Sequence, residues 1–299
     1  MNLTENKQLG ALGFCALSLP AVLFLPQGGW AVALLVSLGS ALLLCFGSSI
    51  PREDQSWQVK ILSIPLFLWN IAIVGKICTI ISEINGVQSP LPGLLLLLLT
   101  GYGVKKQVLP STAAVIAFFM AAIYGILFIF AVPNVEISSL KPAVGQNLSG
   151  MAYGFLPILL LYVYKGEKKK TVALWTSAGL ILILGAAVIT QGMGAQDFYT
   201  AAKSVNILGT MERLEPLVAA ASTAGAYCMM GLLLSVNQNI EKGIKKKESK
   251  YILEIEIIIA SGICILLPEA EEWIWSIGTT VCWGLIPILT QVIVFRKKV

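Results

Sequence analysis

Two stretches of this sequence combine small residues and proline in a way that could hold a small solute. One precedes Pro20 and the other precedes Pro157. Proline removes a backbone donor and glycine weakens a helix, so both favour an interrupted helix. An unwound helix end offers N–H groups to a carboxylate and carbonyl oxygens to an amine or a cation. The residues that we expect to bind substrate are Ala16, Leu17, Ser18, Leu19, Asn147, Ser149, Gly150, Tyr153 and Gly154.

The side chains needed for other chemistry are scarce. Histidine is absent, which removes the most common general base and metal ligand. Six cysteines lie singly in apolar runs, and we interpret them as free thiols that pack like small apolar residues: Cys15, Cys45, Cys78, Cys228, Cys264 and Cys282. The sequence therefore predicts no enzyme, no metal site and no cofactor.

The composition indicates an integral membrane protein. Hydrophobic residues make up 57% of the 299 residues and charged residues only 12%, where a soluble domain carries about 25%. A spanning helix needs about 20 mostly apolar residues. On this criterion we predict ten transmembrane helices, at Gln8–Phe24, Trp30–Cys45, Ile61–Ser82, Leu91–Val104, Leu109–Val132, Val144–Tyr164, Val172–Thr190, Leu214–Val236, Tyr251–Leu267 and Trp273–Phe295.

The basic residues support this count. With the N-terminus in the cytoplasm, all but four of the 21 lysines and arginines fall in inner segments, the exceptions being Lys76, Lys141, Lys203 and Arg213. Both termini are then cytoplasmic. The lysine cluster at 242–250 is expected to contact anionic membrane lipid.

The two proline-containing stretches fall in the first and sixth of the ten predicted helices. Interrupted helices at matching positions are typical of transporters built from inverted repeats. We therefore predict an all-α membrane domain covering residues 1–299, with repeats at about 8–132 and 144–296 and discontinuous helices 1 and 6. The alternative is that glycine and proline serve only packing and kinks, as they often do in membrane helices.

Several motifs resemble the spore germination permease family, the B subunits of nutrient germinant receptors. They are Glu212-Arg213-Leu214-Glu215 before a long apolar helix, Leu17-Ser18-Leu19-Pro20 followed by Gly29-Trp30, Gly101-Tyr102-Gly103-Val104, Leu140-Lys141-Pro142, and the segment from Gly284 to Leu289 followed by Arg296-Lys297-Lys298. The chain is shorter than is usual for this family. It also lacks a match to the acidic residue that often follows the interruption of the sixth helix.

This resemblance implies a fold and a function. The family belongs to the amino acid–polyamine–organocation transporter superfamily, which has a five-plus-five inverted repeat. It implies a permease in the cell membrane or the spore inner membrane that binds a small nutrient such as an amino acid, and that signals with other receptor subunits or transports. The first alternative is an amino acid secondary transporter, either a cation-coupled symporter or an exchanger, with no germination role. The second alternative is a scaffold without a ligand. No nucleic-acid partner is expected.

Further residues are candidates for binding ions. The resemblance implies a cation site at Ser222 and Thr223, although both hydroxyls could instead bond to their own helix. Ionisable side chains in or near predicted spans are functional candidates or, alternatively, interfacial groups: Lys76, Glu83, Glu212, Arg213 and Glu215. No carboxylate lies at mid-depth with an evident partner, so the sequence does not predict proton coupling.

Overall fold

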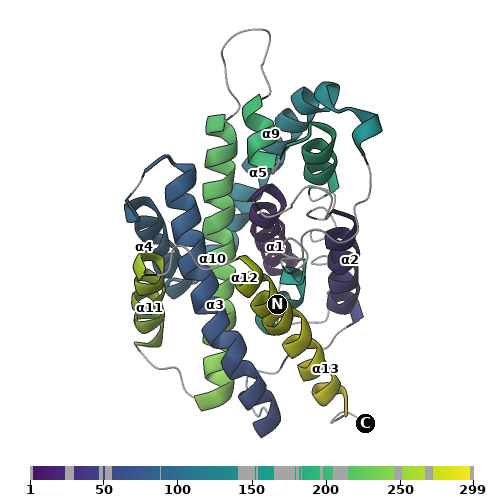
Figure 1. The fold of residues 1–299 in the computed structure, drawn as a ribbon. Coiled ribbons are helices and arrows are strands. Elements are labelled where there is room, and N and C mark those ends of the chain that lie inside the picture. Colours follow the sequence, from purple (N-terminus) through teal and green to yellow (C-terminus); the bar gives the residue numbers. More distant parts are fainter. Residues whose placement is uncertain are drawn as a thin grey trace.

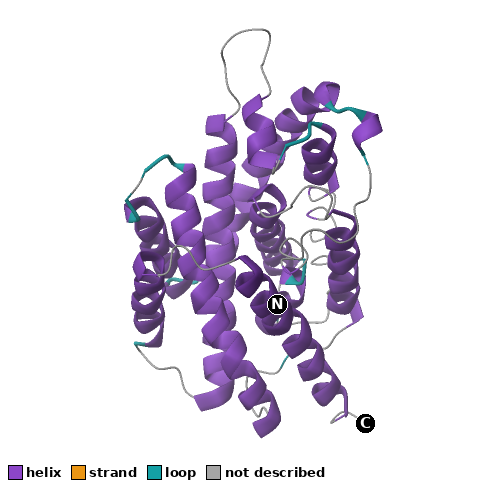
Figure 2. Ribbon diagram, in the orientation of Figure 1, coloured by secondary structure: helices purple, strands orange, loops and turns teal. Residues whose placement is uncertain are grey.

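The chain folds into a bundle of helices, and the described residues contain no strand (Figure 2). The computed structural model describes residues 3–23, 30–46, 50, 56–87, 89–140, 152, 154–164, 179, 182, 184–195, 198–204, 215–245, 251–266 and 272–296. The helices are α1 (Leu3–Leu23), α2 (Trp30–Phe46), α3 (Trp57–Ile84), α4 (Leu91–Lys105), α5 (Leu109–Ala131), α7 (Leu156–Val163), α9 (Phe198–Ser204), α10 (Glu215–Lys245), α11 (Ile252–Leu266), α12 (Glu272–Thr279) and α13 (Ile286–Arg296). Short 3₁₀ turns η1 (Val132–Asn134) and η2 (Ile137–Ser139) follow α5, and a π-helical segment η3 (Thr280–Leu285) joins α12 to α13.

Four stretches among the described residues are helical, long and apolar enough to cross a membrane. They are Trp57–Ile84, Leu109–Asn134, Pro216–Lys245 and Ile274–Arg296. These are the third, fifth, eighth and tenth predicted spans, so the expectation of an all-helical membrane protein is confirmed in these regions. The other predicted spans coincide with the shorter helices α1, α2, α4 and α11, or are described only in part. Ten spans and an inverted repeat stay predictions.

α10 is the central helix of the bundle (Figure 1). It packs against α1, α3, α4, α5 and α7, which surround it. Small residues permit these contacts: a Cβ atom added to Gly231 would collide with the side chain of Leu109 on α5. Helices in lipid have no hydrophobic driving force to associate, so close approach of their backbones supplies much of the association energy.

α1 corrects one prediction. It is a continuous helix from Leu3 to Leu23 that passes through Pro20, so the discontinuity predicted in the first span is wrong. A proline removes only its own N–H bond to the carbonyl four residues earlier. Here the preceding turns are buried between α5 and α10, with Ala16 and Leu19 both 0% exposed. Packing on these sides holds the helix together across the proline.

The sixth predicted span shows an interruption in its described part. Gly154 and Phe155 form a turn, and α7 begins only at Leu156, with Pro157 in its first turn, where the missing N–H costs no helix bond. Asn147, Ser149, Gly150 and Tyr153 lie outside the described residues. Gly154 is buried, as are Leu156 to Tyr162, so α7 is an interior helix.

α10 is longer than predicted. The apolar run suggested an end at Val236, yet the helix continues to Lys245. Asn237 and Asn239, which follow Val236, are 0% and 7% exposed. The predicted span stopped before these amides, but their side chains lie inside the bundle.

Gly93 provides a test of the close packing between α3 and α4. Its N–H donates to Ser82 Oγ at 3.2 Å, and an added Cβ atom would overlap the backbone of Cys78. We expect Gly93→Ala to lower the unfolding free energy by about 1–3 kcal/mol, because backbone cannot yield as a side chain can. Thermal unfolding in detergent measures the change. Gly262→Ala on α11, where nothing lies within 4 Å of the added atom, is the matched control, and equal effects of the two substitutions would contradict the packing argument.

Candidate functional site

α1 and α10 meet where the sequence analysis placed substrate-binding and cation-binding residues. Ala16, Leu17, Ser18 and Leu19 are at most 1% exposed. A Cβ atom added to Gly225 would lie 2.8 Å from Ser18 Oγ and 3.3 Å from the Cys15 carbonyl oxygen. Ser222 precedes Gly225 by about one turn and lies on a similar side of α10, whereas Thr223, two residues before Gly225, points in a different direction. The structure therefore brings the α1 part of the predicted substrate site near Ser222, although α1 contributes packed helix and not unwound backbone.

The hydroxyls at this interface differ in their partners. Thr223 Oγ1 donates to the Ala219 carbonyl at 2.8 Å, which is the alternative of bonding to its own helix. Ser18 Oγ likewise donates to the Cys15 carbonyl at 2.6 Å. Ser222 Oγ is fully buried and has no hydrogen-bond partner among the described residues. The lone pairs of Thr223 Oγ1 stay available after it donates this bond, so Ser222 differs from Thr223 in being fully buried without any hydrogen-bond partner among the described residues.

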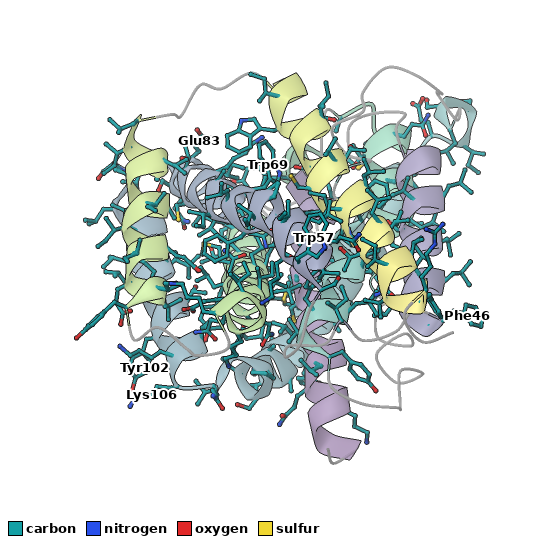
Figure 3. The ribbon with its side chains drawn as sticks, turned by 90° about the horizontal axis from the view of Figure 1, so that it is seen from below. Phe46, Trp57, Trp69, Glu83, Tyr102 and Lys106 are labelled. Atoms are coloured by element: carbon teal, nitrogen blue, oxygen red, sulfur yellow. The ribbon has the colours of Figure 1, made fainter. Side chains whose placement is uncertain are left out.

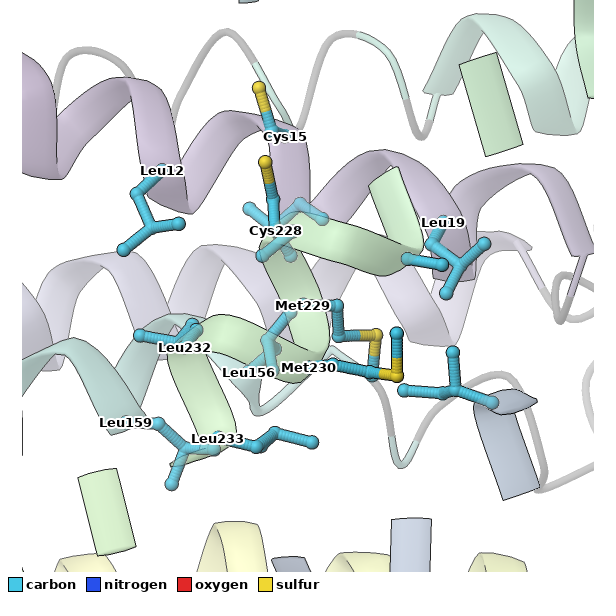
Figure 4. Close-up of a cluster of buried hydrophobic side chains, with 14 of the residues drawn as sticks. Leu12, Cys15, Leu19, Leu156, Leu159, Cys228, Met229, Met230, Leu232 and Leu233 are labelled. Atoms are coloured by element: carbon cyan, nitrogen blue, oxygen red, sulfur yellow. The ribbon is translucent and has the colours of Figure 1, made fainter. Parts of the chain in front are cut away.

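α5 adds a further hydroxyl to this interface. Tyr124 is 2% exposed, its side chain lies close to Ser18, and its oxygen has no completed hydrogen bond among the described residues. Cys15 Sγ lies 3.6 Å from the Ala113 carbonyl oxygen and joins α1 to α5. Around these groups Leu12 and Leu19 of α1, Leu156 of α7 and Met229 of α10 belong to one apolar core (Figure 4).

A second polar cluster, absent from the sequence predictions, joins three segments of the bundle. The Trp283 indole N–H in η3 donates to Asn70 Oδ1 at 2.9 Å, and Asn70 Nδ2 on α3 donates to Asn237 Oδ1 at 2.9 Å. Asn237 Nδ2 then donates to the Phe67 carbonyl at 3.2 Å. All three polar side chains are 0% exposed. A fully connected buried network of this kind specifies one arrangement of its helices.

Glu256 of α11 lies beside this network. It is 1% exposed, and its carboxyl lies near the side-chain amide of Asn237 on α10. Neither carboxyl oxygen has a completed hydrogen bond among the described residues. The sequence analysis found no carboxylate at mid-depth with an evident partner, and it did not consider this buried carboxyl. Glu256 was missed although it stands in the apolar run Ile252–Ile259.

Irregular backbone also meets in the interior. The turn at Gly154–Phe155 lies against η3, because a Cβ atom added to Gly284 would be 3.0 Å from the Phe155 ring. Pro287 accounts for the π-helical segment. Its missing N–H leaves a carbonyl of the preceding turn without its helical hydrogen bond, and the turn widens to accommodate this. Such π segments occur frequently at functional sites.

The predicted charged residues are more dispersed. Lys76 Nζ lies 4.9 Å from the centre of the Trp275 ring, which itself packs against Trp69 at 5.5 Å. Glu83 is exposed near the other end of α3 from Trp57 (Figure 3). Glu215 is the first residue of α10, while Glu212 and Arg213 lie outside the described residues.

An open groove lies between α3 and α13, at the end of α3 where Trp57 is exposed. Its volume is about 440 Å³, and it is lined by Trp57, Gln58, Ile61, Leu62, Ile293 and Arg296. A tryptophan and an arginine beside apolar residues are typical of the boundary between membrane and water, where they contact lipid. The groove therefore suits membrane lipid better than a selective solute site.

Comparison with protein-family models and with curated proteins finds no match to this chain. The resemblance to spore germination permeases rests on the sequence motifs alone.

Ser222 gives a test of the cation prediction. If its free hydroxyl binds sodium, sodium in place of choline raises the melting temperature of the wild-type protein, because a ligand that binds only the folded state stabilises it. Ser222→Ala abolishes this increase. Thr223→Val is the matched control, since the Thr223 hydroxyl already bonds to Ala219. Thermal unfolding in both salts measures the effect, and a sodium response that persists in Ser222→Ala contradicts the assignment.

Proposed function

We propose that this chain is a permease-like membrane protein that binds a small nutrient, an amino acid in the simplest case, inside its helix bundle. The support comes from the motifs that resemble spore germination permeases and from one structural observation: two irregular backbone segments, the turn at Gly154–Phe155 and η3, meet beside α10. In a membrane, irregular backbone is tolerated only where it is buried in protein or lines a cavity. Such segments are where carriers bind their substrates.

The proposed solute site differs from the site that the sequence predicted. The sequence analysis paired interruptions in the first and sixth helices, but the first is continuous. The sixth retains its turn, and its partner is now the π-helical segment of the last span. A substrate at this junction would meet the Phe155 ring and the backbone around Gly284, and it would have to part them because the two are in contact. Asn147, Ser149, Gly150 and Tyr153 precede this turn in sequence and stay candidate ligands.

A second candidate function is secondary transport of amino acids without a role in germination. One observation favours it: the buried Glu256 carboxyl is the kind of group that couples solute movement to a cation. Uptake of labelled amino acid into proteoliposomes distinguishes the two functions, because a sensor binds without accumulation. In either case we place the protein in the cell membrane or, for a germination role, in the spore inner membrane, with both termini in the cytoplasm. A sensor also requires other receptor subunits as partners.

The site is tested by a bulky side chain at Gly284. A screen of amino acids, sugars and nucleosides by thermal shift identifies a ligand that stabilises the wild-type protein. We expect Gly284→Leu to abolish this stabilisation, because the new side chain occupies the space beside Phe155, and to leave membrane insertion intact. Gly125→Leu is the matched control on α5, where nothing lies within 4 Å of the added atom.

Two results would contradict the proposal. If no nutrient in the screen stabilises the wild-type protein, the scaffold interpretation is favoured. If Gly284→Leu binds the ligand as the wild type does, the site lies elsewhere in the bundle.

A further inference from the structure

Glu256 lies on the inward face of α11. The buried residues of this helix are Leu253, Glu256, Ala260 and Cys264, a stripe with helical spacing. The stripe faces α3, since a Cβ atom on Gly75 would lie 2.8 Å from the Ala260 carbonyl oxygen and Thr79 Oγ1 lies 3.6 Å from Cys264 Sγ. Glu256 therefore occupies a packing position that would suit an apolar residue. A carboxylate placed there loses its hydration, and this costs several kcal/mol unless a cation or a proton neutralises it.

The neighbouring network fixes one hydrogen-bond donor next to this carboxyl. An indole N–H can only donate, so Trp283 determines that Asn70 presents its oxygen to Trp283 and its nitrogen to Asn237. Asn237 must then direct its nitrogen away from Asn70, where one N–H reaches the Phe67 carbonyl. The second N–H of that nitrogen is left for the adjoining Glu256 carboxyl. This donor favours the ionised form of Glu256.

Burial acts in the opposite sense. Glu256 is 1% exposed, and neither of its carboxyl oxygens has a completed hydrogen bond among the described residues. A protonated carboxyl avoids the cost of burying an uncompensated charge. The donor on Asn237 and the burial therefore act in opposite directions, which allows a proton to be both bound and released.

Two of the described lysines at this end of the bundle are engaged elsewhere. Lys105 of α4 pairs with Glu254 at 2.6 Å, and Lys60 of α3 donates to the Ile244 carbonyl at 3.3 Å. Lys242 of α10 is half-buried. Glu256 forms no ion pair with any described residue, so a bound proton is the neutralising group that these residues leave for it.

We propose that Glu256 is a proton-binding site on the inward face of α11, beside Asn237 of α10. When the proton leaves, the remaining carboxylate is buried without an ion pair among the described residues. The site does not depend on which solute the protein binds, or on whether it binds one.

Dicyclohexylcarbodiimide tests the proposal on the wild-type chain, because this apolar reagent adds to protonated carboxyl groups and leaves a stable N-acylurea. The purified protein in lipid nanodiscs is labelled over a pH series from about 5 to about 10, and each glutamate is quantified by mass spectrometry. We expect labelling of Glu256 to exceed that of Glu254 by at least about tenfold at neutral pH and to fall as the pH rises. Sodium in place of choline leaves it unchanged.

Two variants complete the experiment. Glu256→Gln removes the pH-dependent label and also the pH dependence of the melting temperature over the same series, whereas Glu254→Gln, two residues away on the exposed side, retains both. The proposal is overturned if Glu254 is labelled as strongly as Glu256 or if labelling of Glu256 does not vary with pH. Protection by sodium at constant pH would also overturn it, since the site would then bind a metal cation. The labelling is measured on the wild-type protein, so the conclusion does not require that either variant folds.

Discussion

The structure depends on one constraint: polar groups inside a membrane must find their partners within the protein. α10 shows how the constraint is met. Asn237 lies at its most buried level, and the hydrogen bonds from Trp283 through Asn70 to Asn237 tie α3, α10 and η3 together. Each donor in this chain has one acceptor, so the relative rotation of the three segments is determined. Small residues at the neighbouring contacts then allow the backbones to approach.

The functional candidates are the places where this constraint is not fully met. Ser222 and Glu256 are buried without completed hydrogen bonds among the described residues, and η3 interrupts the regular bonding of the last span. An unpaired buried polar group costs about 1–3 kcal/mol, and an unpaired charge more. The protein pairs Asn70 and Asn237 completely but leaves these other groups unpaired. This contrast indicates that the unpaired groups serve a function. We propose that a bound solute or ion supplies the missing partner.

Proline illustrates why the site could be predicted only in part. Pro20 and Pro287 both stand inside apolar helices, and the sequence analysis singled out the first. The structure shows regular helix through Pro20 and a π-helical segment before Pro287. Both prolines remove one backbone donor, and the surrounding packing decides whether the helix stays regular or widens. α1 is enclosed by α5 and α10, whereas η3 contacts the turn at Phe155 and donates a side-chain bond to Asn70.

The sequence by itself determined where the long apolar helices lie, because spans such as Leu109–Ala131 need only a local run of apolar residues. It did not determine which polar residues are inside. Glu254 and Glu256 stand two residues apart in one apolar run, yet the first is exposed with Lys105 and the second is buried beside Asn237. A helix turns by about 100° per residue, so positions two apart point in very different directions. Only the packing of α11 on α3 and α4 decided which of the two carboxyls faces the interior.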